Sequence, residues 1–415
     1  MNDTGVSDTA SAGAGAAGLS EKLVAAIRDR RSEFGAAGDR AEELRTLPPD
    51  TVATLREMGL FWLKTPAELG GMPLSPVEFC DVIEELAYAD VSTAWAAMIG
   101  AGCCGLAAGW LPEGGARRVF APGTATSALP VVAGQLAPRG TGKPAEGGYL
   151  VTGRWGFSSG IPHAEWVIGA FRTEASADAD SADSADSGAD ATAGTGFGAM
   201  VVFVAPKSDA EVIDTWYVAG LQGTGSLDFR VDGLFVPAEM TYQLGTAAVR
   251  GGDLFRLGVP AFVSNEVPPL CIGLARRALD DMTGLALKTA RFPGGPTVGE
   301  RAVFHKELGR AETKLRAARL NHRDAMAAAW ETARSGAAPP EEQQLAVTTA
   351  SIFAVETATE VVYDLFKYGG GRVLALSNPM QRHLRNVLAA RQHLALSEEN
   401  YEAAGRYRLK HLGQP

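Results

Sequence analysis

A stretch near the C-terminus combines residue types that could bind an anion and move a proton. It reads YGGGRVLALSNPMQRHLRNVLAARQHLAL over residues 368–396, with a run of three glycines ahead of a helical pattern. A glycine turn followed by a helix N-terminus presents free backbone N–H groups, which are common ligands of phosphate. His393 lies on a polar side of the expected helix, where a neutral imidazole could accept a proton. A plain helix connection with a solvated basic surface is the alternative interpretation.

A second stretch, GRWGFSSG over residues 153–160, could hold a planar ring. Trp155 and Phe157 alternate with small residues, and Ser158 and Ser159 end a predicted strand. Hydroxyl groups beside aromatic rings suit the edge of a heteroaromatic ligand. An ordinary strand end with a Ser-Gly turn explains the same pattern equally well.

Two further features could contribute to such a site. GLQGTGSLDF, residues 220–229, is a Gly/Ser/Thr-rich loop at the entrance of another predicted strand. Arg291, in KTARFPGG, precedes a flexible turn, where it could clamp a phosphate with two hydrogen bonds. A solvated charge at a helix end is the alternative for this arginine.

Three segments with different sequence patterns must position these residues. We expect an α+β, mainly helical fold with an N-terminal helical domain, a middle antiparallel β-barrel or sandwich domain and a C-terminal four-helix bundle. The short β-branched runs of the middle segment are interrupted by an acidic low-complexity insertion, residues 174–196. The expected boundaries are 1–19 for a disordered tail, 20–123 for the first domain, 124–243 for the second and 244–415 for the bundle.

The composition excludes several classes of function. The net charge of −10 argues against nucleic acid or an anionic membrane as the main partner. We find no uninterrupted apolar segment of the length that spans a bilayer, and no GxGxxG or P-loop motif after an early strand. The four cysteines show neither metal-ligand spacing nor a disulfide framework, which favours a reducing cytoplasm and no metal site.

Taken together, these motifs resemble the acyl-CoA dehydrogenase superfamily over nearly the whole chain from about residue 20. The resemblance rests on the order and spacing of FWLKTPAELGG, DVIEELAYADVSTAW, GGYLVTGRWGFSSGIPHAEWVIGAF, GLQGTGSLDFRVDGLFVP, CIGLARRALD, ARFPGG and YGGGRVLALSNPMQRHLRNVLAARQH. It implies the same three-domain fold, a flavin in the cleft between the β domain and the bundle, and usually a homotetramer.

The resemblance also bears on the kind of reaction. Acyl-CoA dehydrogenases commonly carry a glutamate base in a Tyr-Glu-Gly-Thr turn, and a carboxylate there removes the α-proton of an acyl thioester. Counted from Arg385, that turn falls near His393 and Leu394, where this sequence reads QHLAL. GRWGFSSG with RNVLAARQH is instead similar to the flavin-dependent monooxygenase branch, which includes oxygenase components of p-hydroxyphenylacetate hydroxylases, dibenzothiophene monooxygenase and indole-acetate-type oxygenases. An acyl-CoA dehydrogenase with a relocated glutamate and a non-catalytic flavin-binding member are the alternatives.

What the monooxygenase branch implies is a two-component system. A partner NAD(P)H:flavin reductase supplies reduced flavin, FAD or FMN, and O₂ adds to it to give a C4a-hydroperoxide. This transfers one oxygen atom to an aromatic or heteroaromatic small molecule in a water-poor pocket.

By the same resemblance, His393 is the candidate catalytic base and Ser159 is the second catalytic residue. The implied cofactor-binding residues are Trp155, Phe157, Ser158, Ser159, Arg291, Gly369, Gly370 and Gly371. The implied substrate pocket consists of Trp95, Met98, Cys103, Asn386 and Ala390. Because these walls are largely apolar, an indole-like or polycyclic substrate is favoured over a small phenol.

Overall fold

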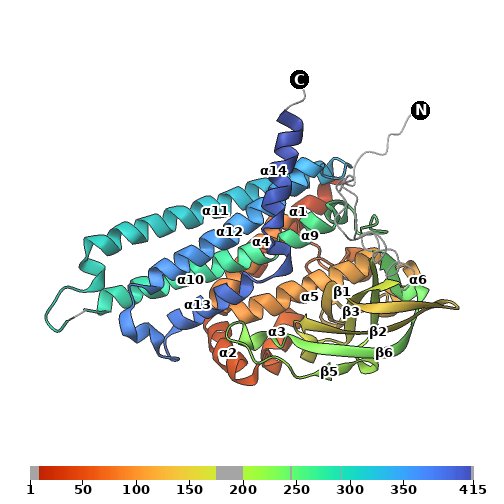
Figure 1. Cartoon of the computed structure of the whole chain (residues 1–415), viewed down its shortest axis with the longest axis horizontal. Coiled ribbons are helices and arrows are strands. Elements are labelled where there is room, and N and C mark those ends of the chain that lie inside the picture. Colours follow the sequence, from red (N-terminus) through yellow and green to blue (C-terminus); the bar gives the residue numbers. More distant parts are fainter. Residues whose placement is uncertain (1–8, 174–199, 244, 291, 413–415) are drawn as a thin grey trace, which may run out of the picture.

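The computed structural model describes residues 9–173, 200–243, 245–290 and 292–412. Six helices come first, then a seven-stranded sheet, then a second set of helices (Figure 1). This order of helical, β and helical parts confirms the expected fold class. Arg291 and the acidic insertion lie outside the described residues.

The N-terminal part packs around one apolar helix. Its helices are α1 (Thr9–Asp29), α2 (Arg31–Leu44), α3 (Pro49–Glu57), α4 (Pro76–Ala89), α5 (Val91–Trp110) and α6 (Glu113–Val119). α1 starts at Thr9, so residues 9–19 are helical, in place of the expected disordered tail; alanine-rich sequence without proline favours a helix. Asp90 caps α5 by accepting a hydrogen bond from the Thr93 N–H at 2.7 Å.

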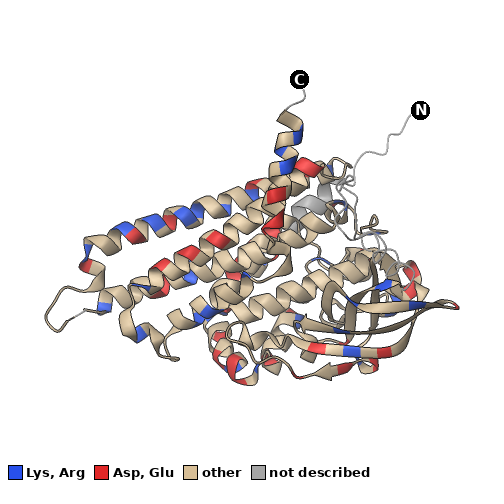
Figure 2. Ribbon diagram, viewed as in Figure 1, with Lys and Arg blue, Asp and Glu red and all other residues tan. Residues whose placement is uncertain are grey.

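α5 is the helix around which the N-terminal part is built. It carries no charged residue and nearly all of its side chains are buried, whereas charges spread over outer helices such as α11 (Figure 2). By length and composition, α5 and α12 (Glu341–Phe366) could each cross a membrane. Most residues in these apolar windows are buried inside the protein, which is typical of core helices.

The middle part is a single sheet with strand order β5-β6-β2-β1-β3-β4-β7. Its strands are β1 (Val132–Ala145), β2 (Gly148–Ser158), β3 (Trp166–Thr173), β4 (Met200–Pro206), β5 (Glu211–Ile213), β6 (Leu227–Pro237) and β7 (Thr241–Gln243). Neighbouring strands are antiparallel except β1 and β3, which run parallel. The expectation of a purely antiparallel unit was therefore wrong for this pair, because the chain crosses from β2 back to the far side of β1.

The C-terminal part contains the expected bundle, with a shorter fourth helix. Its helices are α8 (Asp253–Arg256), α9 (Gly258–Ser264), α10 (Val267–Lys288), α11 (Ala302–Arg334), α12 (Glu341–Phe366), α13 (Pro379–Ala390) and α14 (Glu399–Leu412). α10, α11 and α12 run side by side (Figure 1). The predicted last helix is broken after Ala390, and α14, which buries none of its residues, extends away from the body of the molecule.

A buried ion pair joins the N-terminal part to the bundle. The Lys64 ammonium donates hydrogen bonds to the Glu266 carboxylate at 2.7 Å, to the Asn265 side chain at 2.9 Å and to the Phe262 carbonyl at 2.5 Å. Only 1% of the Lys64 side chain and 5% of the Glu266 side chain are exposed. All three ammonium protons of the lysine are donated in these hydrogen bonds, so the ammonium has no donor left for a ligand and the contact is structural.

Three histidines, the buried His322 and the partly buried His163 and His393, should make the fold sensitive to acid. Burial lowers the pKa of His163 to about 3, and those of His322 and His393 to about 4. In the unfolded chain, histidine takes up a proton near pH 6.5, so below that pH the unfolded state binds more protons. We expect the free energy of unfolding to fall as the pH drops from about 6.5 toward 4, by up to about 1.4 kcal/mol per pH unit for each histidine. Urea denaturation at pH 7, 6 and 5 checks this, and a flat profile over that range would contradict it.

Candidate functional site

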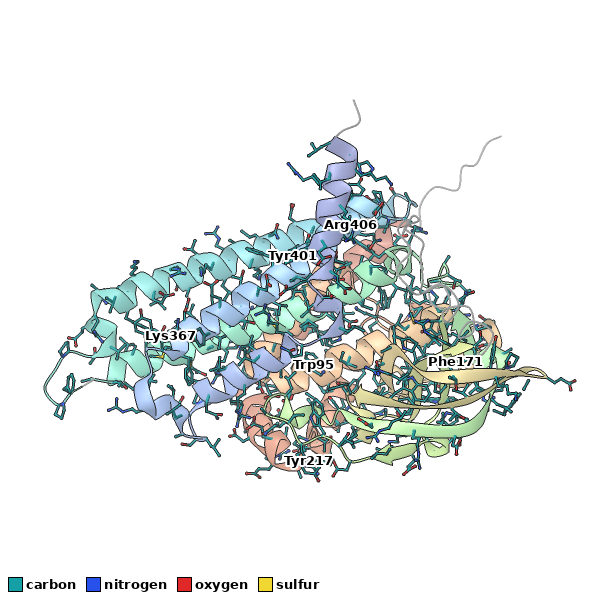
Figure 3. All side chains as sticks on the ribbon, viewed as in Figure 1. Trp95, Phe171, Tyr217, Lys367, Tyr401 and Arg406 are labelled. Carbon is teal, nitrogen blue, oxygen red and sulfur yellow. The ribbon has the colours of Figure 1, made fainter. Side chains whose placement is uncertain are left out.

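Trp95 connects the three parts of the chain. It lies on α5 near the centre of the molecule, close to α13 (Figure 3). Its indole N–H donates to the Ser159 hydroxyl at 2.9 Å, and Ser159 follows directly after β2. Its ring meets the His393 imidazole edge to face, with 5.7 Å between the ring centroids. The structure therefore brings together the two residues that the sequence suggested as catalytic, with Trp95 between them.

A chain of buried hydroxyls continues from Ser159 into the loop before β6. The Ser159 and Ser226 hydroxyl oxygens are 2.7 Å apart, and Ser226 lies 2.7 Å from the Thr224 hydroxyl oxygen. Thr224 donates to the Leu221 carbonyl at 2.9 Å. The sequence marked this loop only by its Gly/Ser/Thr composition, and neither Ser226 nor Thr224 was singled out.

His393 lies in the break after α13, where a continuous helix was predicted. Its backbone is extended, and its Nδ1 accepts a hydrogen bond from the Ala395 N–H at 3.3 Å, which caps the short turn that follows. An imidazole that accepts at Nδ1 carries its proton on Nε2 when neutral. Burial keeps the pKa of His393 at about 4, so the ring is neutral at pH 7 and presents an Nε2–H donor.

Phe157 and Ser158 have unusual surroundings for the end of a strand. The β2–β6 register shifts between Trp155 and Ser158, and Phe157 takes a left-handed conformation with φ of 59°. Its ring is 72% exposed. The Ser158 hydroxyl is buried and has no hydrogen-bond partner within the described residues. Strained backbone, an exposed ring and an unsatisfied hydroxyl are features that cluster where ligands bind.

Replacing Phe157 with glycine should raise stability and weaken binding at this site. Glycine adopts the left-handed conformation without strain, so we expect the free energy of unfolding to rise by about 1 kcal/mol. The exposed ring contributes little burial that could offset this gain. Thermal unfolding and a flavin titration on the same sample measure both effects. A variant that is less stable than the wild type would show that the strain is absent.

The loop that carries the hydroxyls is fastened to α13. The Asn386 side-chain oxygen accepts a hydrogen bond from the Leu221 N–H at 2.7 Å. A Cβ atom on Gly220 would come within 2.1 Å of the Arg385 carbonyl oxygen, so only glycine allows this approach. Arg385 in turn donates to the Ala219 carbonyl. Asn386, predicted as a pocket residue, is thus a clamp between the bundle and the β part.

Other predicted site residues are more dispersed. Trp155 is completely buried in the sheet, where its indole N–H donates to the Ala170 carbonyl at 2.8 Å and its ring stacks on Phe229. This packing corrects the prediction that Trp155 contacts the flavin. Met98 and Cys103 lie on α5 with Trp95, and both are buried.

The glycine turn predicted to bind the cofactor lies apart from the group of Trp95, Ser159 and His393. Gly369, Gly370 and Gly371 lie beyond the far end of α13 from His393, and a helix of that length spans about 18 Å. Ala390 is buried at the near end, one turn before His393. The basic residues of α13 are neutralised by carboxylates: Arg382 pairs with Asp39 and Glu42, Arg385 with Glu42, and His383 with Asp281.

A groove with a volume of about 610 Å³ lies elsewhere, between α1, α4, α10 and α11. Its walls are mostly charged, and Glu84 at its floor forms ion pairs with Arg276 and Arg319. No residue of the Trp95, Ser159 and His393 group lines it. We therefore regard this groove as a charged surface feature that is separate from the candidate site.

Comparison with known proteins identifies the family. Residues 22–109 match the acyl-CoA dehydrogenase N-terminal domain and residues 268–398 match the acyl-CoA dehydrogenase C-terminal domain, together more than half of the chain. The chain belongs to the acyl-CoA dehydrogenase family. This explains the succession of helical, β and bundle parts.

Relatives within the acyl-CoA dehydrogenase family are monooxygenases. Indole-3-acetate monooxygenase from Pseudomonas putida is 27% identical over 93% of this chain and 92% of its own length. The oxygenase subunit HsaA, a flavin-dependent monooxygenase from Rhodococcus jostii, is 27% identical over 91% of this chain and 94% of its own. Both relatives are monooxygenases by name, and each match covers more than 90% of this chain.

A solved structure supports the fold. XiaF from Streptomyces sp., determined in complex with FADH2 and glycerol, superposes with a TM-score of 0.84. The match covers 96% of this chain and 97% of XiaF at 24% sequence identity.

Proposed function

We propose that the protein is the oxygenase component of a two-component system that uses FADH2 and O₂ to hydroxylate an aromatic or heteroaromatic small molecule. A separate NAD(P)H:flavin reductase would supply the reduced flavin. One oxygen atom enters the substrate and the other leaves as water, with both electrons coming from the reduced flavin. The observation that carries the proposal is the meeting of Ser159, Trp95 and His393 beside the unsatisfied Ser158 and the exposed Phe157.

The residues present fit a flavin ring. Ser159 would accept a hydrogen bond from the polar N5 edge of the ring with its remaining lone pair. The Ser158 hydroxyl has no hydrogen-bond partner within the described residues. Phe157 offers an aromatic face without losing buried contacts. Bound reduced flavin supplies the activation of O₂, and the protein residues orient, donate hydrogen bonds and exclude water.

His393 and the walls around it suit the substrate side. The neutral imidazole presents an Nε2–H donor to a substrate oxygen or nitrogen. If a substrate hydroxyl must lose its proton, Nδ1 is the atom of this ring that can accept it, at the expense of the weak Ala395 bond. Met98, Cys103 and Ala390 are buried and without charge, which favours an indole-like or polycyclic substrate and a water-poor environment.

The dehydrogenase alternative requires a carboxylate base, and the site does not offer one. In the part of the chain that the structure describes, the hydrogen bonds of Trp95, Ser159 and His393 go to hydroxyls and backbone groups. Glu398 and Glu399, after His393, are exposed. Glu266 is buried but is bound to Lys64.

The proposal extends to assembly and location. We propose a homotetramer, in which the neighbouring subunit could meet the exposed α14 and the distant glycine turn. A reducing cytoplasm is consistent with the four buried free cysteines.

An anaerobic titration followed by an oxygen pulse tests the function. We expect FADH2 to bind more tightly than FAD, and ¹⁸O₂ to label a product formed from an indole-type substrate. FMNH2 serves as the control that separates the two flavins. Tight binding of oxidised FAD, no label in any product and bleaching by an acyl thioester would overturn the proposal in favour of a dehydrogenase.

A further inference from the structure

We propose that the buried hydroxyl chain makes the site selective for reduced over oxidised flavin. This chain, called the relay below, consists of Trp95, Ser159, Ser226, Thr224 and the Leu221 carbonyl. The inference rests on the proposed function, in which Ser159 holds the N5 edge of the ring. It assigns Thr224 and Ser226 as positioning residues, because they act on the flavin only through Ser159.

The two ends of the relay fix the direction of every proton in it. The indole N–H of Trp95 can only donate, and it donates to Ser159 at 2.9 Å. The Leu221 carbonyl can only accept, and the Thr224 hydroxyl donates to it at 2.9 Å. With its own proton committed, Thr224 accepts from Ser226 at 2.7 Å. Ser226 then accepts from Ser159, also at 2.7 Å.

This order of protons leaves Ser159 as an acceptor toward any ligand. Its single proton points to Ser226 and one of its two lone pairs receives the Trp95 N–H. One lone pair remains. All four side chains are buried, so water does not readily supply or remove a proton along the relay.

Reduced and oxidised flavin differ at the atom that meets this lone pair. N5 of reduced flavin carries a hydrogen and donates, whereas N5 of oxidised flavin has a lone pair and accepts. The relay with this order of protons therefore pairs with reduced flavin and places two lone pairs against each other with oxidised flavin. An unpaired polar contact in a buried site is costly.

Oxidised flavin is accommodated with every hydroxyl contact paired only when the relay reverses. Thr224 would then donate to Ser226, Ser226 to Ser159 and Ser159 to N5, and the hydrogen bond from Thr224 to Leu221 would be lost. The carbonyl would still accept from the Thr224 N–H at 3.2 Å and from the Trp216 indole at 3.1 Å, so the penalty is finite. The loss of about one hydrogen bond corresponds to a preference of about threefold to tenfold.

Conservative substitutions in the relay test the inference. Thr224→Val and Ser226→Ala each remove a hydroxyl while keeping most of the volume. Ser226→Ala removes the acceptor of the Ser159 proton, and Thr224→Val frees Ser226 to donate to Ser159. In either variant Ser159 can donate to oxidised N5. We expect the ratio of the Kd for FAD to the Kd for FADH2 to fall by about threefold to tenfold in both variants. In bound oxidised flavin, the ¹⁵N signal of N5 should also show a new hydrogen bond.

Thr241→Val is the matched control. Thr241 is a buried threonine at the start of β7 that donates to the carbonyl three residues earlier, Ala238, at 2.9 Å, as Thr224 does to Leu221. Thr241 lies outside the relay, so the ratio of the Kd for FAD to the Kd for FADH2 in this variant should equal that of the wild type. Thermal unfolding of all variants shows whether each is folded.

Two results would overturn the inference without touching the proposed function. In one, the wild type prefers FADH2 and both variants keep its ratio within twofold. In the other, the variants lose affinity for both flavins equally, which would make the relay a support of the loop alone. A wild type without any preference for reduced flavin would instead refute the proposed function, and the inference with it.

Discussion

His393→Ala is expected to lower the rate of oxygen transfer by about two to four orders of magnitude, the usual range for a residue that positions or moves a proton. The imidazole is partly buried and neutral, and it contacts the Ala395 N–H and the Trp95 ring. Single-turnover product formation, started by mixing oxygen with protein, reduced flavin and substrate, measures the step directly. Binding of reduced flavin should change little, because the proposed function assigns contact with the ring to Ser159 and not to His393.

A comparison of substitutions separates two roles of this ring. His393→Gln keeps an N–H donor but cannot act as a base, so it should retain more activity than His393→Ala if donation from Nε2 is what matters. Equal losses in both variants would indicate proton abstraction. Gln392→Ala, at the exposed neighbouring position, is the control. An alanine variant of His393 with near wild-type turnover would remove this residue from the mechanism.

Lys64→Met should cost about 3–5 kcal/mol of unfolding free energy, the range seen when one partner of a buried ion pair is removed. The substitution leaves the Glu266 carboxylate without its cation and two further acceptors, on Asn265 and Phe262, without their donor. Equilibrium denaturation in urea measures the loss. Because Lys64 and Glu266 join the N-terminal part to the bundle, the transition should also become less cooperative.

The double variant Lys64→Met/Glu266→Gln should recover part of the stability, since the buried charge is then absent. Arg117→Met is the matched control, because Arg117 forms an exposed ion pair with Glu113. It should leave the unfolding free energy nearly unchanged. If Lys64→Met were as mild as this control, the buried pair would not hold the two parts together.

Features that depend on neighbours in sequence could be predicted well. The apolar periodicities and the change to short β-branched runs indicated helices, sheet and bundle in the right order. GRWGFSSG marked a strand end with Ser158 and Ser159, and the structure adds the strain at Phe157. These signals are local, because capping, alternation and turn chemistry act over a few residues.

Features that depend on distant partners could not be predicted. Lys64 and Glu266 are 202 positions apart in the sequence, and no sequence pattern around either residue predicts that they pair. Trp155 lies in a motif beside site residues but faces the sheet core, because side chains alternate along a strand. The break after Ala390 carries no proline or glycine, and it becomes understandable only from the capping bond between His393 and Ala395.

The contacts that join the loop at Gly220 and Leu221 to Asn386 on α13 have a consequence for redesign of the protein. These contacts hold the loop bearing Thr224 against the helix that leads to His393. Under the proposed function, the flavin side and the substrate side of the site therefore keep a fixed relative position. Changes to the pocket wall on α5 should therefore broaden substrate scope without misaligning the two halves. Changes at Asn386 should misalign the two halves. Oxygen would then be consumed without formation of product, and the electrons of the reduced flavin would be released as hydrogen peroxide.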